Sequence, residues 1–204
     1  MASPHEGCAC GMVGRSVGVW LGNRAPSIRL TIDAAFADDA VGARLSRDGV
    51  ALIGYSMGGY TSLAVAGDRP IAGSYETADG EIRAVAVLSD QRARAMVLLA
   101  PACVWFRSDG ALADVDVPIF MRTAEKGEIA PSLHIDVIKR GIRDPARVDH
   151  RVIPNAGHHA FQSPFPSAMT RPGFAPSRNP DGFDRTAFQP IQYADILSFL
   201  RRVL

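Results

Sequence analysis

Four short apolar stretches, each separated from the next by sequence that suits a helix, constrain the fold of this chain most strongly. They lie at residues 49–56, 94–102, 117–125 and 149–157. The first shows no alternation of apolar and polar residues, which is typical of a strand buried on both faces of a parallel sheet. Strands that alternate with helices build an open α/β sheet. We therefore predict an α/β fold with an open, mostly parallel sheet and flanking helices.

Helical periodicity brackets these strands at both ends of the chain. An amphipathic helix is expected from Ile28 onward, with Pro26 and Ser27 as its start signal, and a small-residue helix directly follows residue 56. In the closing segment, a stripe is expected to face the core: Ile191, Ala194, Leu197, Leu200 and Leu204.

The domain organisation follows from these signals. Residues 1–26 are predicted to be irregular and residues 27–204 to form a single domain. Gly, Pro and acidic residues mark 67–81 as a surface insertion, and prolines and glycines mark 162–182 as an irregular loop. Loops of this length in a compact domain are often functional.

Composition limits the classes of partner. The chain has 204 residues, of which 47% are hydrophobic, enough for one sizeable core. Its net charge of +1 gives no global field for nucleic acid or an anionic membrane, so a small-molecule partner is expected. Three cysteines and the lack of a signal or spanning segment point to a reduced, cytoplasmic setting. Cys8 and Cys10 have no second ligand pair at metal spacing, so neither a metal nor a cofactor is expected.

The stretch "LIGYSMGGY" places a lone serine between glycines at the end of the first strand. Gly54, Ser56 and Gly58 fit G-x-S-x-G, a pattern that holds a serine on a sharp strand-to-helix turn. Side chains at the two glycines are expected to collide with the turn or the helix. The backbone N–H of Met57 would then point where an oxyanion forms, at a helix N-terminus. The alternative is that Ser56 simply caps the helix.

A serine nucleophile needs a base within hydrogen-bond reach. His158 and His159 follow the fourth strand directly, behind Ala156 and Gly157. Serine before histidine is the chain order of α/β-hydrolases. The remaining histidines, which are His5, His134 and His150, are interpreted as structural or solvated.

The sequence resembles α/β-hydrolases of the dienelactone-hydrolase type, including esterases related to platelet-activating-factor acetylhydrolase. The matching pieces over residues 20–204 are "RLTIDAAFADD", "GYSMGGYTSLAVAG", "VLLAPA", "NAGHHAF" and "DGFDRTAFQ". The resemblance implies Ser56 as nucleophile, His158 as base and His159 as a pocket neighbour. It also implies ester, lactone or thioester hydrolysis through an acyl-enzyme.

The chain departs from this family at the acid of the triad. Where the family shows aspartate after the third strand, "TAEKGEIAP" has Gly127, which cannot orient an imidazole. Glu128, and less favourably Glu125, could substitute for it. Equally, both could be solvated loop residues.

A second departure lies before the serine. Only about fifty residues precede it, and they contain no strand ahead of "HEG", so the oxyanion role is not assigned to His5 or Gly7. The predicted fold is thus an α/β-hydrolase lacking its first strands. The strand at 49–56 would be left with an uncovered edge, where a homodimer could form.

Three functions were weighed on these grounds. The first is a serine hydrolase that cleaves a small ester. The second is an inactive hydrolase-fold protein that serves as a binding or interaction module, and the third, a kinase-like or dinucleotide-binding role, has no supporting motif. Asp181, Asp184 and Arg185 are expected to fix the long loop against the site, with Asp184 capping the final helix.

Overall fold

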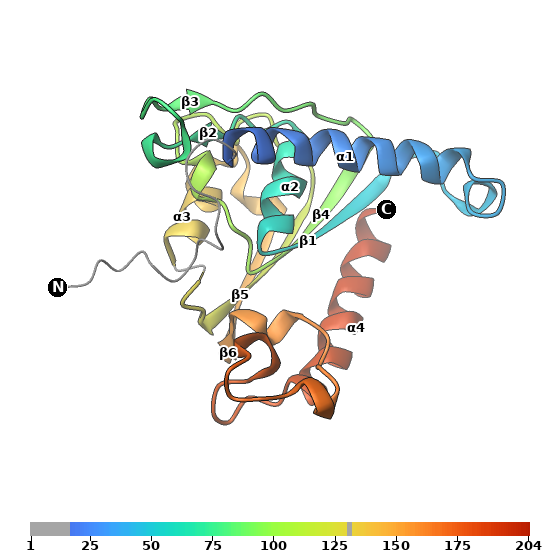
Figure 1. Cartoon of the computed structure of the whole chain (residues 1–204). Helices are drawn as coiled ribbons and strands as arrows, with labels where there is room; N and C mark the ends of the chain where they lie inside the picture. Colours follow the sequence, from blue (N-terminus) through green and yellow to red (C-terminus); the bar gives the residue numbers. More distant parts are fainter. Residues whose placement is uncertain (1–16, 130–131) are drawn as a thin grey trace.

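A computed structural model describes residues 17–129 and 132–204. Its main sheet has four parallel strands in the order β1-β4-β5-β6, which confirms the predicted α/β class (Figure 1). Their bounds are Val50–Tyr55 for β1, Ala93–Leu99 for β4, Ile119–Lys126 for β5 and Val148–Gly157 for β6. All four predicted strands are therefore present, with β1 at one edge of the sheet and β6 at the other.

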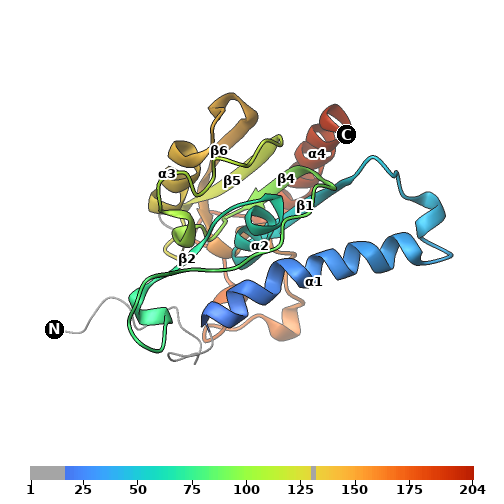
Figure 2. The same cartoon turned by 90° about the horizontal axis from the view of Figure 1, so that it is seen from above.

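Helices cover both faces of this sheet (Figures 1 and 2). On one face lie α1, Val17–Ala37, α2, Met57–Ala66, and α3, Ser132–Gly141; on the other lies α4, Arg185–Val203. Alternate residues of each strand divide between two cores, so that Met96 and Leu98 face α2 while Val97 and Leu99 face the α4 side.

The expected insertion near 67–81 forms a small antiparallel pair of β2, Ile71–Ala72, and β3, Arg83–Ala84. Short 3₁₀ turns lie in the loops, at Gly42–Arg44, Ser74–Glu76, Val104–Phe106, Pro145–Arg147, His158–Phe161, Ser167–Met169 and Ala175–Ser177. The long loop at 162–182 contains only such turns, as its prolines and glycines predict.

The start of α1 is a correction. The helix begins at Val17, so residues 17–26 are not irregular, and Pro26 lies inside the helix instead of opening it. A proline inside a helix removes one backbone bond, but packing overrides this cost because Leu21 and Ala25 are fully buried in the core. Residues 1–16, which include Cys8 and Cys10, lie outside the described residues.

A second correction concerns which face of α4 is buried. Its buried residues are Arg185, Gln189, Gln192 and Phe199. Most of the stripe predicted to face the core is exposed instead, including Ile191 and Leu197. The helix packs over β4 and β5, where Phe199 contacts Phe120. Its exposed residues Tyr193 and Leu197 instead line a hollow next to β1, at the edge of the sheet.

Candidate active site

Ser56 lies between the end of β1 and the first residue of α2. Its backbone angles, φ 52° and ψ −116°, fall where a residue with a side chain is strained. Two hydrogen bonds hold it there: its N–H donates to the Leu99 carbonyl at 2.9 Å, and its carbonyl accepts from the Ala102 N–H at 2.9 Å. The predicted strained turn is confirmed, and the simple helix-cap alternative fails because the Ser56 side chain makes no capping bond.

The glycines around Ser56 differ in what they do. A Cβ on Gly54 would lie 2.3 Å from the carbonyl oxygen of Gly58, so the predicted collision is confirmed there. A Cβ on Gly58 would meet nothing within 4 Å, so that part of the prediction is wrong. Gly58 faces a hollow between α1, α2 and β1, which explains the free space. The close contact belongs to Gly59, whose Cβ would lie 2.5 Å from that of Pro101.

The structure brings His158 to Ser56 from the opposite edge strand. His158 begins the 3₁₀ turn that follows β6, and its Nε2 lies 3.1 Å from the Ser56 Oγ. The histidine is only 7% exposed. A hydroxyl and an imidazole nitrogen at this distance can exchange a proton directly.

The electrostatics favour a neutral His158. Burial, with a smaller contribution from the nearby His159 and His134, lowers its pKa to about 4. A neutral imidazole with its proton on Nδ1 leaves Nε2 free to accept the Ser56 proton. The Nδ1 atom is buried and has no hydrogen-bond partner among the described residues.

The predicted contact between Glu128 and His158 is not formed, which corrects the acid assignment. After β5 the chain turns back on itself, with the Glu128 N–H donating to the Lys126 carbonyl at 3.1 Å, and Glu128 is exposed. Glu125 is occupied elsewhere, because its Oε2 accepts the Asn155 N–H at 2.6 Å.

Gly127 and His158 each follow directly after the last paired residues of β5 and β6. Lys126 pairs with Gly157 across β5 and β6, so Gly127 comes level with His158 where both strands end. The position at which the sequence analysis expects an aspartate therefore lies at the same end of the sheet as His158.

Tyr55 is a site residue that the sequence analysis missed. Its hydroxyl lies 3.0 Å from the His159 Nδ1, and its ring centroid lies 5.2 Å from that of His158. Burial raises the pKa of Tyr55 to about 12, so it remains a neutral phenol. The position of Tyr55 directly before Ser56 is the sequence signal that could have identified it. His159, expected to line the pocket, is thus held beside the pair by Tyr55.

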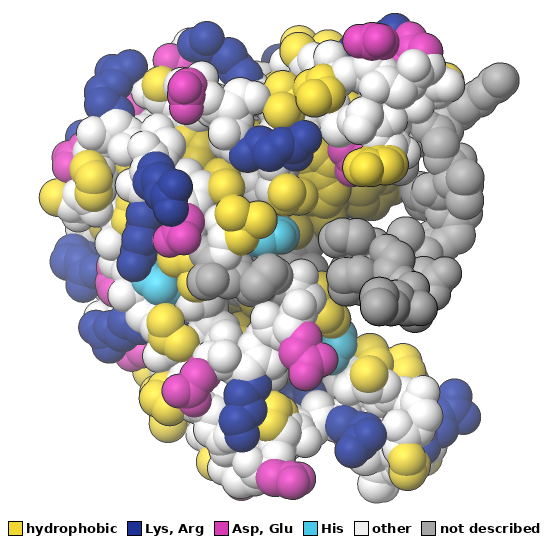
Figure 3. Space-filling model, turned by 90° about the vertical axis from the view of Figure 1, so that its left-hand side faces the viewer, with side chains coloured by type: hydrophobic (Ala, Val, Ile, Leu, Met, Phe, Trp, Pro, Cys, Tyr) yellow, Lys and Arg dark blue, Asp and Glu magenta, His cyan; other side chains and the backbone are white. Residues whose placement is uncertain are grey.

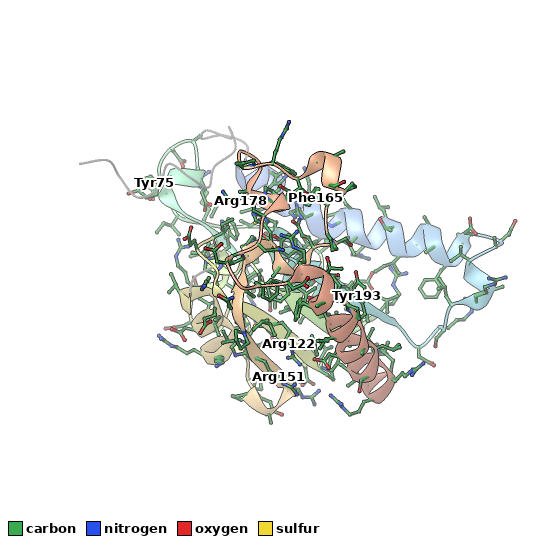
Figure 4. The ribbon with its side chains drawn as sticks, turned by 90° about the horizontal axis from the view of Figure 1, so that it is seen from below. Tyr75, Arg122, Arg151, Phe165, Arg178 and Tyr193 are labelled. Atoms are coloured by element: carbon green, nitrogen blue, oxygen red, sulfur yellow. The ribbon has the colours of Figure 1, made fainter. Side chains whose placement is uncertain are left out.

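Arg185 anchors the long loop below the site. The side chain is 2% exposed and donates to the Asn179 Oδ1 at 2.9 Å and to the carbonyls of Pro176 and Arg178 at 2.9 and 2.7 Å. Figure 4 shows Arg178 and Phe165 in this loop. The role predicted for Arg185 is confirmed.

Asp184 and Asp181 act differently from each other. Asp184 caps α4 by accepting the Ala187 N–H at 3.0 Å, as predicted. Asp181 contributes its backbone carbonyl, which accepts from the Asn155 Nδ2 at 2.8 Å.

Replacing Asp184 with alanine should therefore lower the free energy of unfolding by about 1 kcal/mol, the usual cost of losing such a cap. Asp181→Ala is the matched control and should change stability little, because the acceptor in its hydrogen bond is the backbone carbonyl, which alanine retains. Urea unfolding of both variants measures the difference. If Asp184→Ala kept its stability but the turnover of each folded molecule fell strongly, this structural role would be contradicted.

The oxyanion donor that the sequence predicts is the backbone N–H of Met57. It is the first residue of α2, and N–H groups in the first turn have no partner within their own helix. Negative charge is stabilised at this end of a helix. His5 and Gly7 lie outside the described residues.

Two other histidines, His134 and His150, have hydrogen-bond partners in the fold. His134 Nδ1 accepts the Cys103 N–H at 3.0 Å, and His150 Nε2 lies 2.9 Å from the Thr123 Oγ1. Within 17–129 and 132–204, no group of three or more His, Cys, Asp and Glu side chains is placed to hold a metal ion. In the same ranges, no helix has the length and apolar character needed to cross a membrane.

The surface around this end of the molecule carries mixed charges. Figure 3 shows histidine side chains near the centre of the face, with basic and acidic side chains interspersed around them. A substrate that approaches the described part of this face meets no strong field of one sign.

Comparisons with known proteins do not assign the chain to a family. No protein-family model and no curated protein matches the chain. One solved structure similar to it is a bifunctional GH43-CE protein of Bacteroides eggerthii, with a TM-score of 0.41 and 14% sequence identity. The match covers 63% of this chain and 23% of that protein. The fold and the contacts define an α/β protein with a serine–histidine pair at the carboxyl end of its sheet.

Proposed function

We propose that this chain is a serine hydrolase that cleaves small carboxylic esters or lactones through an acyl-enzyme. The observation that carries the proposal is the 3.1 Å approach of the His158 Nε2 to the Oγ of Ser56, on a strained strand-to-helix turn. In this proposal the chain has an α/β-hydrolase type of fold. Ser56 is the nucleophile and His158 the base.

The chemistry follows from the two side chains. The Ser56 Oγ attacks the ester carbonyl carbon while its proton passes to the His158 Nε2. The carbonyl oxygen becomes an oxyanion, which the Met57 N–H stabilises. As the carbonyl re-forms, the alcohol leaves with the proton from His158. Water then attacks the acyl-enzyme by the same route and releases the acid.

The unpaired Nδ1 limits this reaction. His158 becomes an imidazolium in the transition state, and no described carboxylate stabilises that charge. The nucleophile, base and oxyanion donor still contribute without the acid. Turnover is therefore expected to be slow but measurable.

Turnover of p-nitrophenyl acetate tests the proposal. Ser56→Ala should lower kcat/KM by about 10³-fold or to the uncatalysed background, and His158→Ala should do the same. His159→Ala is the matched control, since His159 contacts Tyr55 instead of Ser56, and should retain most activity. Undiminished turnover in folded Ser56→Ala would overturn the proposal.

The pH dependence should reflect the low pKa of His158. Because only the neutral imidazole accepts a proton, kcat/KM should stay level from about pH 8 to about pH 6 and decline only as the pH approaches about 4. The unfolded state binds this proton near the ordinary value of 6.5, so stability also falls between that pH and about 4. A pH–rate profile with circular dichroism at each point separates the two effects. An acid limb centred near 6.5 would contradict the burial argument.

A second function is favoured by the same unpaired nitrogen. A hydrolase fold that lost its acid could bind an ester-like molecule without cleaving it. Binding of a non-hydrolysable ester analogue that survives Ser56→Ala, in a protein without turnover, would identify such a binding module.

A further inference from the structure

The outer edge of β1 presents unpaired backbone groups. The N–H of Val50 donates to the Arg92 carbonyl at 2.7 Å and that of Ser56 to the Leu99 carbonyl, so even-numbered residues face β4. Because a strand alternates, the N–H and C=O groups of Ala51, Ile53 and Tyr55 point the other way. Among the described residues no strand pairs with that side.

Apolar hollows flank this edge on both faces of the sheet. On the α4 side, a hollow of about 440 Å³ is lined by Ile53, Tyr55, Tyr193 and Leu197 among others. On the other side, a smaller one lies between β1, α1 and α2. A strand added to β1 would place alternate side chains in the two hollows.

Helix α4 continues the apolar surface beyond the edge. Tyr193 and Leu197 are 53% and 47% exposed, beside Ile53 at 60%. Figure 4 shows Tyr193 on the side of α4 toward α1, with Arg122 and Arg151 on the opposite side. The apolar side of α4 thus faces the open edge.

The two edges of the sheet differ in protection. β6 carries Asp149, Arg151 and Pro154, the kinds of residue that keep an edge strand from pairing. β1, with the sequence "VALIGY", carries no charge, no proline and no lysine. A second copy of β1 fits this edge, because it is itself an apolar strand that brings no charge and no proline to the pairing.

We propose that two copies of the chain join through antiparallel pairing of β1 with β1. A two-fold axis at Ile53 pairs it with the partner's Ile53 and pairs Ala51 with the partner's Tyr55, so every outward-facing group of the strand is used. The result is one continuous sheet with the two α4 helices on the same face. This proposal does not depend on the hydrolase activity.

The mass in solution tests the association. Sedimentation over a range of concentrations should show a dimer that dissociates on dilution, and Ile53→Lys should give a monomer. Val152→Lys, on β6, is the matched control, because Val152 is likewise an exposed β-branched residue of an edge strand, with 48% of its surface exposed. This substitution should leave the dimer intact. Circular dichroism establishes that both variants fold. A monomer at all concentrations, a dimer that survives Ile53→Lys, or larger assemblies would overturn the proposal.

A cross-link tests the register. Directly opposite residues in a hydrogen-bonded antiparallel pair have Cα atoms about 5.5 Å apart, within disulfide range. In a background with Cys8 and Cys10 replaced by serine, Ile53→Cys should therefore form an intermolecular disulfide rapidly. Val152→Cys should not.

Hydrogen exchange tests the pairing in the unmodified protein, without any substitution. Amides of Ala51, Ile53 and Tyr55 should gain protection as concentration rises, while those of Leu52 and Gly54 stay protected throughout. Equal, concentration-independent exchange of the first three amides would overturn the pairing.

Discussion

Replacing Gly127 with aspartate is expected to raise kcat/KM for p-nitrophenyl acetate by about 10²–10⁴-fold, the range over which a triad acid acts. The pairing of Lys126 with Gly157 brings residue 127 level with His158, whose Nδ1 is buried without a partner. A carboxylate there would accept a hydrogen bond from the Nδ1–H and stabilise the imidazolium that forms when Ser56 attacks. Few substitutions at a candidate active site are expected to increase activity.

Two controls separate charge from shape. Gly127→Asn has nearly the same size without the charge and should give little gain. Glu128→Ala should leave the natural turnover unchanged, because Glu128 is exposed and makes no contact with His158. The new aspartate should also raise the pKa of His158 and shift the acid limb of the pH–rate profile upward. A folded Gly127→Asp protein with unchanged turnover would contradict the assignment of the gap.

Replacing Gly54 with alanine is expected to lower the free energy of unfolding by about 3 kcal/mol or more. The new Cβ would lie 2.3 Å from a backbone carbonyl of α2, and a backbone atom cannot move aside without opening the turn at Ser56. Gly58→Ala should do the opposite and stabilise the protein by about 0.5–1 kcal/mol, because alanine is the better helix former and its Cβ meets open space.

Chemical unfolding of the two variants measures this contrast. Each variant adds one methyl group at a different glycine of the same motif, so each is the control for the other. Equal destabilisation by both would mean that the turn, and with it the placement of Ser56, differs from the arrangement described.

The sequence was sufficient for the sheet and for the pair at its carboxyl end. Apolar runs and helical stretches alternate along the chain, and residues just after parallel strands gather at one edge. For that reason Ser56 and His158 could be paired from the sequence alone. The strain at Ser56 follows from the same local pattern.

The failures came from packing that a local pattern does not report. Pro26 looked like a helix start, yet the burial of Leu21 and Ala25 extends α1 through it. The stripe with Leu197 looked core-facing, but whether a helix face is covered depends on where the sheet ends. Glu128 is exposed on the turn after β5 and does not pair with the buried Nδ1 of His158.

Labelling with a fluorophosphonate probe tests the central claim most directly, because the probe reacts only with an activated serine. Mass spectrometry should locate the adduct on Ser56, and labelling should be lost in Ser56→Ala and strongly slowed in His158→Ala. Ser163→Ala, which changes a serine of the neighbouring loop, should label like the unmodified protein. Absence of an adduct on folded protein, or an adduct elsewhere, would contradict a working nucleophile–base pair.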